Sequence, residues 1–277
     1  MTETAGAYAM DAADGETWSP IVELRQYTLH PGMRDVLIEL FDREFVESQE
    51  AVGMKVIGQF RAIDDPDRFI WLRGFADMPS RAQALEAFYG GPVWEQHRAA
   101  ANATMIDSDN VLLLRPARPD SGFVLDSERP PPGSKKIPEG LVVATIYHLN
   151  ESDADDFLAF FESALAPALI DTGASILAVF VTENCPNNFP RLPVREGEQV
   201  LVSFAAFANE STYERHRVGL AETPRWQELS KELKHRQKRD VEVWKLRPTA
   251  RSQCTADTMI ETRHSRPGVR SMSETSS

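Results

Sequence analysis

The pattern of apolar and polar positions over residues 20–116 predicts alternating strands and helices. Strict alternation of apolar and polar residues is typical of strands, and apolar residues three or four positions apart are typical of helices. The predicted order is strand, helix, strand, strand, helix, strand, with strands at 21–29, 55–62, 68–75 and 110–116. This is the order of the ferredoxin-like fold, in which an antiparallel sheet carries both helices on one face.

The second half of the chain repeats this pattern. Tyr27 recurs as Tyr147, 120 positions later, and Trp94 recurs as Trp226, 132 positions later. The difference between the two offsets places a 12-residue insertion between positions 180 and 199 of the second copy. Because two constant offsets align about a hundred residues with themselves, the sequence predicts a tandem repeat.

Changes in composition divide the chain into five segments. The linker contains three consecutive prolines, which favour an extended chain, and the last segment has too few apolar residues to offset the entropy of ordering. The proline-containing insertion at 182–198 predicts a loop at the mouth or edge of the structure. The predicted segments are a flexible N-terminus (1–19), an α+β domain (20–116), a Pro-rich linker (117–140), a second α+β domain (141–248) and a disordered tail (249–277).

A ferredoxin-like sheet leaves one face without helices, and that face needs a cover. The strand at 68–75 places aromatic side chains and Arg73 on one face, and this face is too apolar to be left in water. We therefore predict an α+β fold with two tandem ferredoxin-like domains packed sheet to sheet as an intramolecular pseudo-dimer. Trp71 and Arg73 correspond to Ser203 and Ala205 in the second copy, which predicts a cavity between the sheets.

Polar and aromatic side chains of the first copy are expected to line this cavity. One carboxylate and two guanidinium groups suit a small anionic or carbonyl-bearing ligand held by bidentate arginine contacts. The alternative is that Glu23, Arg25 and Arg73 are cross-strand charge pairs that close the sandwich. The predicted ligand-binding residues are Glu23, Arg25, Tyr27, Trp71 and Arg73 of the first copy and Tyr147 of the second.

The sequence carries few other signals of catalytic or metal chemistry. It contains no HExxH motif, no glycine-rich phosphate loop and no Gly-x-Ser-x-Gly nucleophile elbow. His97 is interpreted as a solvated helix residue, and His148 points to the opposite strand face from its neighbour Tyr147. Cys185 and Cys254 lack the spacing of metal ligands or of a disulfide framework. We therefore expect neither a metal nor a cofactor.

Charge and hydropathy narrow the expected partners. The net charge of −12 and the pI near 5.0 argue against nucleic acid, because the long-range field repels phosphate. No apolar run approaches the roughly 20 residues of a spanning helix, and the first twenty residues lack a targeting signal. We expect a cytoplasmic protein without membrane insertion that binds a small molecule, and homo-oligomerisation stays open.

Two motifs resemble those of a known family. Residues 23–29 (ELRQYTL), followed by proline and glycine at 31–32, resemble the opening signature of the NIPSNAP family, and Pro-Val-Trp at 92–94 is similar to that family's helical proline and tryptophan. The resemblance covers both copies, 21–116 and 141–248, although the second copy lacks the Glu and Arg of the opening motif. It implies the dimeric α+β barrel superfamily, whose members include cofactor-free monooxygenases, haem enzymes and binding modules.

Three functions follow as hypotheses, and the sequence leaves open whether the protein is an enzyme. The first is a NIPSNAP-like protein that binds a small molecule between its two halves. The second is a cofactor-free monooxygenase or isomerase, in which Arg25 and Arg73 stabilise an enolate-like anion and Tyr27 or Glu23 moves a proton. The third is a protein-interaction scaffold that uses the outer helices.

Overall fold

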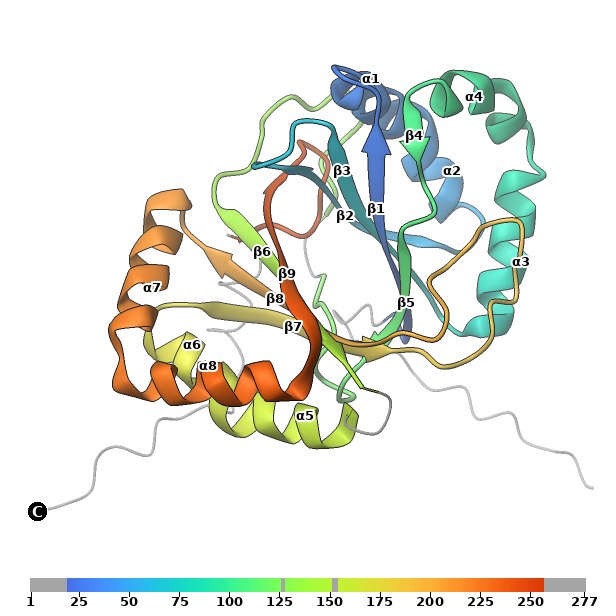
Figure 1. The fold of residues 1–277 in the computed structure, drawn as a ribbon. Helices are drawn as coiled ribbons and strands as arrows, with labels where there is room; N and C mark the ends of the chain where they lie inside the picture. Colours follow the sequence, from blue (N-terminus) through green and yellow to red (C-terminus); the bar gives the residue numbers. More distant parts are fainter. Residues whose placement is uncertain (1–18, 126–127, 151–153, 257–277) are drawn as a thin grey trace, which may run out of the picture.

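The computed structural model describes residues 19–125, 128–150 and 154–256. Each half of the chain contributes strands that form a continuous sheet and helices that cover its outside (Figure 1). In the first half the elements are β1 (Ile21–Leu29), α1 (Arg34–Leu40), the π-helix η1 (Phe41–Phe45), α2 (Val46–Glu50), β2 (Lys55–Ala62), β3 (Arg68–Phe75), α3 (Met78–Tyr89), α4 (Pro92–Asn102), β4 (Met105–Asp107) and β5 (Val111–Pro116). In the second half they are β6 (Leu141–Leu149), α5 (Ala154–Phe160), the π-helix η3 (Phe161–Leu165), α6 (Ala166–Asp171), β7 (Ser175–Thr182), β8 (Gln199–Phe207), α7 (Glu210–Glu222), α8 (Pro224–Arg236) and β9 (Gln237–Pro248).

Local features recur at the same positions of both halves. Asp77 and Asn209, 132 positions apart, are the N-caps of α3 and α7, and each side chain accepts a hydrogen bond from a backbone N–H in the first turn. Gly53 and Gly173, 120 positions apart, follow the first helices with positive φ angles of 92° and 106°, which favour glycine. The π-helices η1 and η3 also correspond. The repeat in the sequence is therefore a repeat of local structure.

Hydrogen bonds between edge strands close the sheet into a barrel. The strand order is β3-β2-β9-β6-β8-β7-β5-β1-β4, and an additional pairing of β1 with β3 closes the sheet, with the short strand β4 paired to the end of β1. The halves meet at two seams, where β2 pairs with β9 and β5 pairs with β7. The expected pair of separate sheets, stacked face to face, is thus corrected to one closed sheet. Closure gives the backbone groups of the edge strands hydrogen-bond partners. A sandwich of two separate sheets would leave these backbone groups unpaired.

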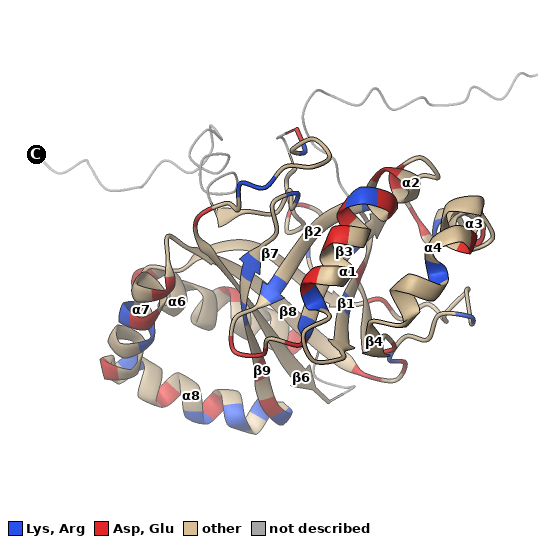
Figure 2. Ribbon diagram, turned by 90° about the horizontal axis from the view of Figure 1, so that it is seen from above, with Lys and Arg blue, Asp and Glu red and all other residues tan. Residues whose placement is uncertain are grey.

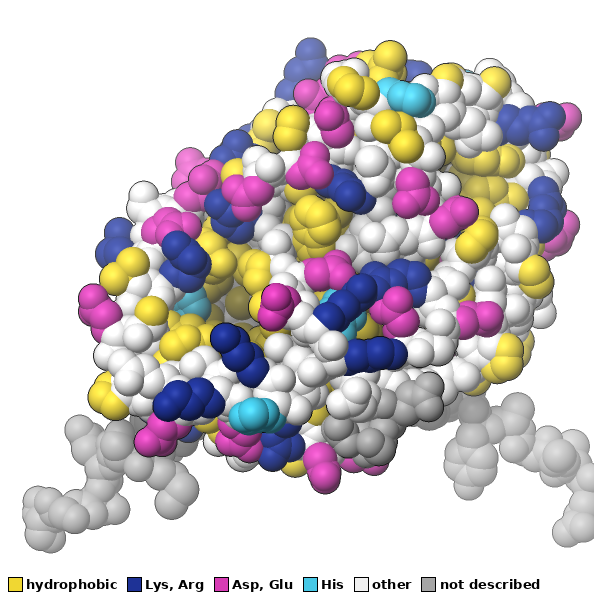
Figure 3. Space-filling view, in the orientation of Figure 1, with side chains coloured by type: hydrophobic (Ala, Val, Ile, Leu, Met, Phe, Trp, Pro, Cys, Tyr) yellow, Lys and Arg dark blue, Asp and Glu magenta, His cyan; other side chains and the backbone are white. Residues whose placement is uncertain are grey.

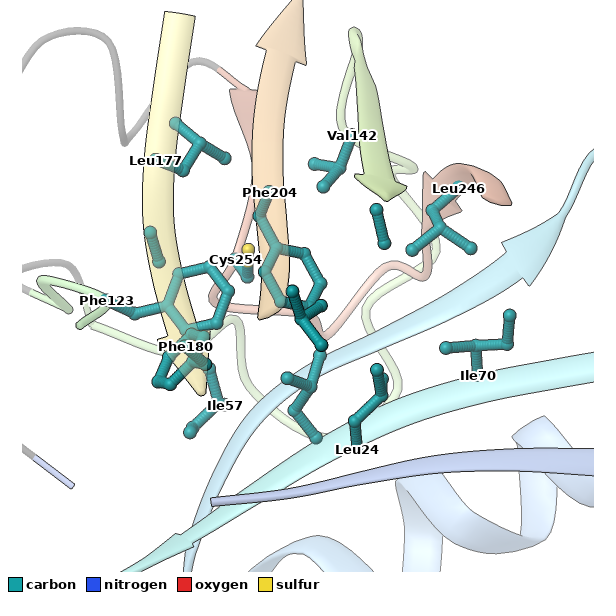
Figure 4. Packing of buried hydrophobic residues seen from close by; sticks show 14 of the residues in the cluster. Leu24, Ile57, Ile70, Phe123, Val142, Leu177, Phe180, Phe204, Leu246 and Cys254 are labelled. Atoms are coloured by element: carbon teal, nitrogen blue, oxygen red, sulfur yellow. The ribbon is translucent and has the colours of Figure 1, made fainter. Parts of the chain in front are cut away.

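Apolar side chains from both halves fill the inside of the barrel. This position corresponds to the cavity that we expected between the two sheets, so that expectation is wrong. Burying these side chains supplies the main stabilisation of the closed sheet, at about 25 cal/mol per Å² of apolar surface. The interior residues include Leu24, Ile70, Val142, Phe180, Phe204 and Leu246 (Figure 4). Charged residues are concentrated on outer helices such as α1, α7 and α8 (Figure 2).

The segment 249–256, expected to belong to a disordered tail, is buried at one end of the barrel. Cys254 and Ala256 are fully buried in the barrel core, and Figure 4 shows Cys254 among the core side chains. The backbone N–H groups of Thr249 and Cys254 donate to carbonyl oxygens of β2, at 2.8 and 3.1 Å. The prediction of disorder was based on low apolar content. It failed because hydrogen bonds and an ion pair of polar groups hold most of this segment in place. The rest of the expected tail, 257–277, and the expected flexible N-terminus up to residue 18 lie outside the described residues.

The Pro-rich linker also packs against the barrel. Phe123 and Leu125 belong to the barrel core, so the linker is more than a spacer. Arg129 donates hydrogen bonds of 2.7 Å to both Glu50 of α2 and Gln253 of the C-terminal segment. Arg129 therefore connects the linker to α2 and to the C-terminal segment.

We predict that truncation after Pro248 strongly destabilises the protein, whereas truncation after Ala256 has little effect. The shorter chain loses the burial of Cys254 and Ala256 and the ion pair of Arg251 with Glu47. The expected loss is about 3 kcal/mol or more of unfolding free energy, measured by urea denaturation. Equal unfolding free energies of the two truncated proteins would show that residues 249–256 do not contribute to stability.

Asp42 of η1 provides a second test of this packing. Burial raises the pKa of Asp42 to about 6, although Arg251 and other nearby arginines oppose the shift. Its carboxylate accepts a hydrogen bond from Gln59 Nε2 at 3.0 Å, which an asparagine oxygen also accepts. Because the folded pKa lies above the unfolded one, the carboxyl group stabilises the fold below about pH 4, and this contribution is lost as pH rises through 6.

We therefore predict that Asp42→Asn stabilises the protein by about 2 kcal/mol at pH 7.5 and has little effect near pH 4. Urea denaturation at both pH values measures the difference. An equal gain in unfolding free energy at both pH values would contradict this explanation, because the gain would then not depend on ionisation of Asp42.

Candidate functional site

The residues expected to bind a ligand in the first half do lie together, but on the outside of the barrel wall. In the register of β1 and β3, Glu23 is opposite Arg73 and Arg25 is opposite Trp71. These side chains face the helices of their own half and pack in the same cluster as Phe41 and other helix residues. Their placement inside the barrel is therefore corrected. The mainly apolar face of each strand points inward, because a closed interior has no helix or solvent to satisfy charges.

Three buried arginines share one buried carboxylate. Arg25 Nη1 lies 2.7 Å from Glu23 Oε2, and Arg73 Nε donates to the same oxygen at 2.8 Å. Arg81 of α3 donates from Nε to Glu23 Oε1 at 2.8 Å. All four side chains are at most 1% exposed. We call Glu23, Arg25, Arg73 and Arg81 the arginine cluster.

The cluster keeps an excess of positive charge. Among the described residues, Glu23 is the only carboxylate within 4 Å of these three arginines. Burial alone would raise the pKa of Glu23, but the guanidinium groups of Arg73, Arg25 and Arg81 hold it far below its usual range. The carboxylate therefore stays ionised, and two of the three guanidinium charges have no counter-charge. Uncompensated buried charge is costly, which favours binding of an anion.

Three buried N–H groups in or beside the arginine cluster make no hydrogen bond within the described residues. Arg73 Nη2 and Arg81 Nη2 lie 2.8 and 2.7 Å from Glu23 oxygens, but the geometry is that of an ion pair without a hydrogen bond. The indole N–H of Trp71 is likewise buried without an acceptor among the described residues. Buried donors are almost always paired in native proteins, and among the described residues the Trp71 N–H is the donor of this site with neither a hydrogen bond nor an ion pair.

Neutral oxygen atoms complete the inner side of the cluster. Arg25 Nε donates to the Tyr27 hydroxyl at 2.9 Å, and Arg73 Nη1 donates to the Tyr89 hydroxyl at 3.3 Å and to Gln49 Oε1 at 3.1 Å. Burial raises the pKa of Tyr27, although Arg25 opposes the shift, so the phenol stays protonated. Because each phenol oxygen accepts from an arginine, its own hydrogen is free to donate to a ligand.

A small aromatic cavity borders these hydroxyl groups. Its volume is about 30 Å³, and since one water needs about 10–15 Å³, it has room for two waters or a group of two or three atoms. The π-helix η1 supplies Phe41 and Phe45 to the wall, and such helices are frequent at functional sites. Figure 3 shows hydrophobic side chains gathered at a recess near α4. The lining residues are Tyr27, Leu37, Phe41, Phe45, Gln49, Trp71, Phe88, Tyr89, Trp94, Ala101 and Met105.

The insertion of the second half closes the outer side of the arginine cluster. It forms a loop between β7 and β8, as expected, and this loop reaches across the barrel to α3 (Figure 1). Arg81 Nη1 donates to the side-chain oxygens of Asn187 and Asn188 at 3.1 and 2.7 Å. The ring of Phe189 stacks on Tyr89 with a centroid distance of 6.1 Å. One copy of the repeat therefore covers the charged site of the other.

Arg81 and Tyr89 were missed by the sequence analysis. Both lie on α3, where the spacing of residues does not reveal that a charge points toward a strand. Their counterparts in the second copy are Tyr213 and Ala221. The absence of an arginine at the position equivalent to Arg81 was the signal in the sequence that could have pointed to this residue.

Tyr147 is not part of this site, which corrects the expectation. It lies in the other half, where its ring packs 5.5 Å from that of Phe157. Burial raises its pKa to about 12, although a hydrogen bond with Ser203 opposes the shift. The positions of Glu23 and Arg73 are taken by Val143 and Ala205 in this half, so no charged site forms around Tyr147.

Comparison with known proteins finds a family model that is similar to the first half of the chain and solved structures that share the fold. Residues 22–119 match the model of the NIPSNAP family. The comparison with curated proteins gave no match. In the described ranges, no helix is long and apolar enough to cross a membrane, and no three His, Cys, Asp or Glu side chains are grouped to hold a metal ion.

Three solved structures resemble most of the chain. A proposed monooxygenase from Lactobacillus acidophilus NCFM is 15% identical, with 83% of this chain and 94% of that chain covered and a TM-score of 0.50. A proposed monooxygenase from Fusobacterium nucleatum is 12% identical, with 83% and 93% covered and a TM-score of 0.51. An anthrone oxidase-like protein is 13% identical, with 85% and 95% covered and a TM-score of 0.52. At these identities the likeness concerns the α+β fold alone.

We predict that Glu23→Gln destabilises the protein by about 3–5 kcal/mol at pH 7, because it leaves three buried guanidinium groups without a counter-charge. Since the folded pKa of Glu23 is lowered, its stabilisation is present above the ordinary pKa of about 4.5 and declines at lower pH. The difference from the parent protein should therefore shrink between pH 5 and pH 3 in urea denaturation.

Glu95→Gln, at an exposed position of α4, is the matched control. It should change the unfolding free energy by less than about 0.5 kcal/mol. If Glu23→Gln is as harmless as this control, the carboxylate does not hold the cluster together.

Proposed function

We propose that the first half of the protein binds a small anionic or carbonyl-bearing molecule between the barrel wall and its helices. The observation that carries this proposal is the arginine cluster, in which three buried guanidinium groups share one carboxylate next to donors without acceptors. A ligand oxygen in the cavity would accept from Trp71 Nε1 and from the hydroxyls of Tyr27 and Tyr89. The two excess positive charges would stabilise its negative charge.

The walls and the size of the cavity narrow the ligand further. Aromatic rings such as Phe45, Phe88 and Trp94 surround the space, so the part of the ligand beyond its polar group would be apolar or planar. Small-molecule pockets usually measure about 300–1,000 Å³, which is far above the 30 Å³ of this cavity. A ligand of more than a few atoms would therefore enter by displacing the loop that carries Phe189 or the helices beside it.

Binding is favoured over catalysis because the cluster offers no suitable base. Glu23 has a strongly lowered pKa, so its carboxylate accepts protons poorly at neutral pH. Tyr27 has a raised pKa and stays protonated. The arginines would still stabilise an enolate-like anion, as a cofactor-free monooxygenase or isomerase requires, but the proton transfer lacks a group with a pKa near 7.

We predict that formate and benzoate stabilise the protein in a saturable manner in thermal unfolding, since a ligand of the native state adds RT ln(1 + [L]/Kd). Formate fits the present cavity, and benzoate adds the aromatic ring. Tyr89→Phe removes one donor and keeps the ring, and Trp71→Phe removes the indole N–H and leaves a smaller aromatic ring. Each should weaken the apparent affinity about tenfold.

Tyr213→Phe, which removes a hydroxyl from the second half, is the control and should respond like the parent protein. The proposal is wrong if neither anion stabilises the parent, or if the two site variants respond as strongly as the control. Oxygen consumption with the bound compounds distinguishes turnover from binding.

A further inference from the structure

The second half lacks the arginine cluster but has a buried histidine at the rim of the barrel. His148, near the end of β6, is 3% exposed. Its Nε2 lies 2.9 Å from Glu242 Oε1, and its Nδ1 lies 3.1 Å from Arg239 Nη2. A guanidinium group only donates, so Nδ1 is the acceptor and Nε2 carries the hydrogen that Glu242 accepts. The two partners thus define the tautomer of the imidazole.

Irregular pairing of β9 directs both partners toward His148. Arg239 and Glu242 are three residues apart, and in a regular strand they would lie on opposite faces. From Ile146 opposite Glu242 to His148 opposite Arg239, β9 uses one residue more than β6, and a second extra residue follows before Gln237. Such bulges redirect side chains and are common at barrel rims and beside functional sites.

A cavity of about 330 Å³ opens beside the Nδ1 side of this histidine. Its volume is in the range of small-molecule pockets. The lining residues are His148, Leu149, Glu198, Gln199, Lys238 and Arg239. Figure 3 shows acidic and basic side chains crowded near the middle of this face. We call this cavity the rim site.

Charge around the rim site favours a negatively charged ligand. Lys238 and Arg239 line the cavity, and Arg195 is paired with Glu198 at its edge. Together with Glu198 and Glu242, these groups leave one excess positive charge, in a chain whose net charge is −12. The guanidinium of Arg239 is half exposed, so it can turn from the imidazole toward a ligand at low cost.

The equivalent positions of the first copy show that closure of the barrel rim does not require a histidine paired with a carboxylate. His148 corresponds to Thr28 and Glu242 corresponds to Asn110, both neutral. Asn110 and Thr28 accept hydrogen bonds from Arg195 and Arg68, but no imidazole or carboxylate stands there. A role in barrel closure therefore does not explain the buried histidine and its carboxylate.

We propose that the rim site binds a small oxyanion, a carboxylate or a phosphate group, independently of the site in the first half. Arg239 and Lys238 bind the anion by charge-assisted hydrogen bonds. His148 stays held by Glu242, and its Nδ1 loses the hydrogen bond from Arg239 when that guanidinium turns to the anion. Glu198 and Gln199 border the ligand on the side of β8.

The test is a titration of the full chain with inorganic phosphate and, separately, with acetate, at constant ionic strength. Saturable binding by calorimetry is expected for at least one anion. The ¹⁵N signal of His148 Nδ1 should shift on binding, because this nitrogen loses its hydrogen bond from Arg239. Arg239→Gln changes a half-exposed side chain and should fold normally, but it should weaken binding about tenfold or more.

Arg236→Gln, at the end of α8, removes the same charge three residues away and should bind like the parent protein. Binding of phosphate alone identifies a phosphate site, and binding of acetate as well identifies a general oxyanion site. Absence of saturable binding by either anion overturns the proposal. So does equal weakening in Arg236→Gln and Arg239→Gln, or an unchanged Nδ1 signal on binding.

Discussion

Pairing of edge strands across the two halves is the constraint on which the other features of this protein depend. A four-stranded sheet has two open edges, and each half closes its edges on the other at the seams β2–β9 and β5–β7. Closure defines an inside and an outside for every strand. The inside has no access to helices or solvent, so it takes the apolar face of each strand. In the first half, the face that carries charged residues is left to the helices.

The outer layer is where the two copies of the repeat differ. In the first copy, the face of β1 and β3 holds the arginine cluster and its small cavity, whereas the same face of the second copy holds Val143, Thr145, Ser203 and Ala205. The second copy differs at the rim instead, where bulges of β9 bring Arg239 and Glu242 to His148. A shared backbone thus carries two different polar sites, each in one copy only.

Contacts between distant segments join the two copies into one unit. The inserted loop of the second copy covers Arg81 with Asn187 and Asn188 and covers Tyr89 with Phe189. The C-terminal segment runs along β2 of the first copy, and Arg129 of the linker binds it. Because a loop covers the outer side of the charged site, access to it depends on the hydrogen bonds from Arg81 to this loop and on one ring stack.

The sequence by itself determined the repeat, the strands and the common face of Glu23, Arg25, Tyr27, Trp71 and Arg73. These features follow from periodicity, which sets the relative direction of side chains along one element. Periodicity does not say which face of a strand points into the core, and only the closed barrel decided that the charged face lies under the helices. Arg81 joined the cluster, Tyr147 was separated from it, and 249–256 became buried through contacts between residues far apart in the chain. Such contacts depend on packing and on hydrogen bonds of buried polar groups, neither of which leaves a local pattern in the sequence.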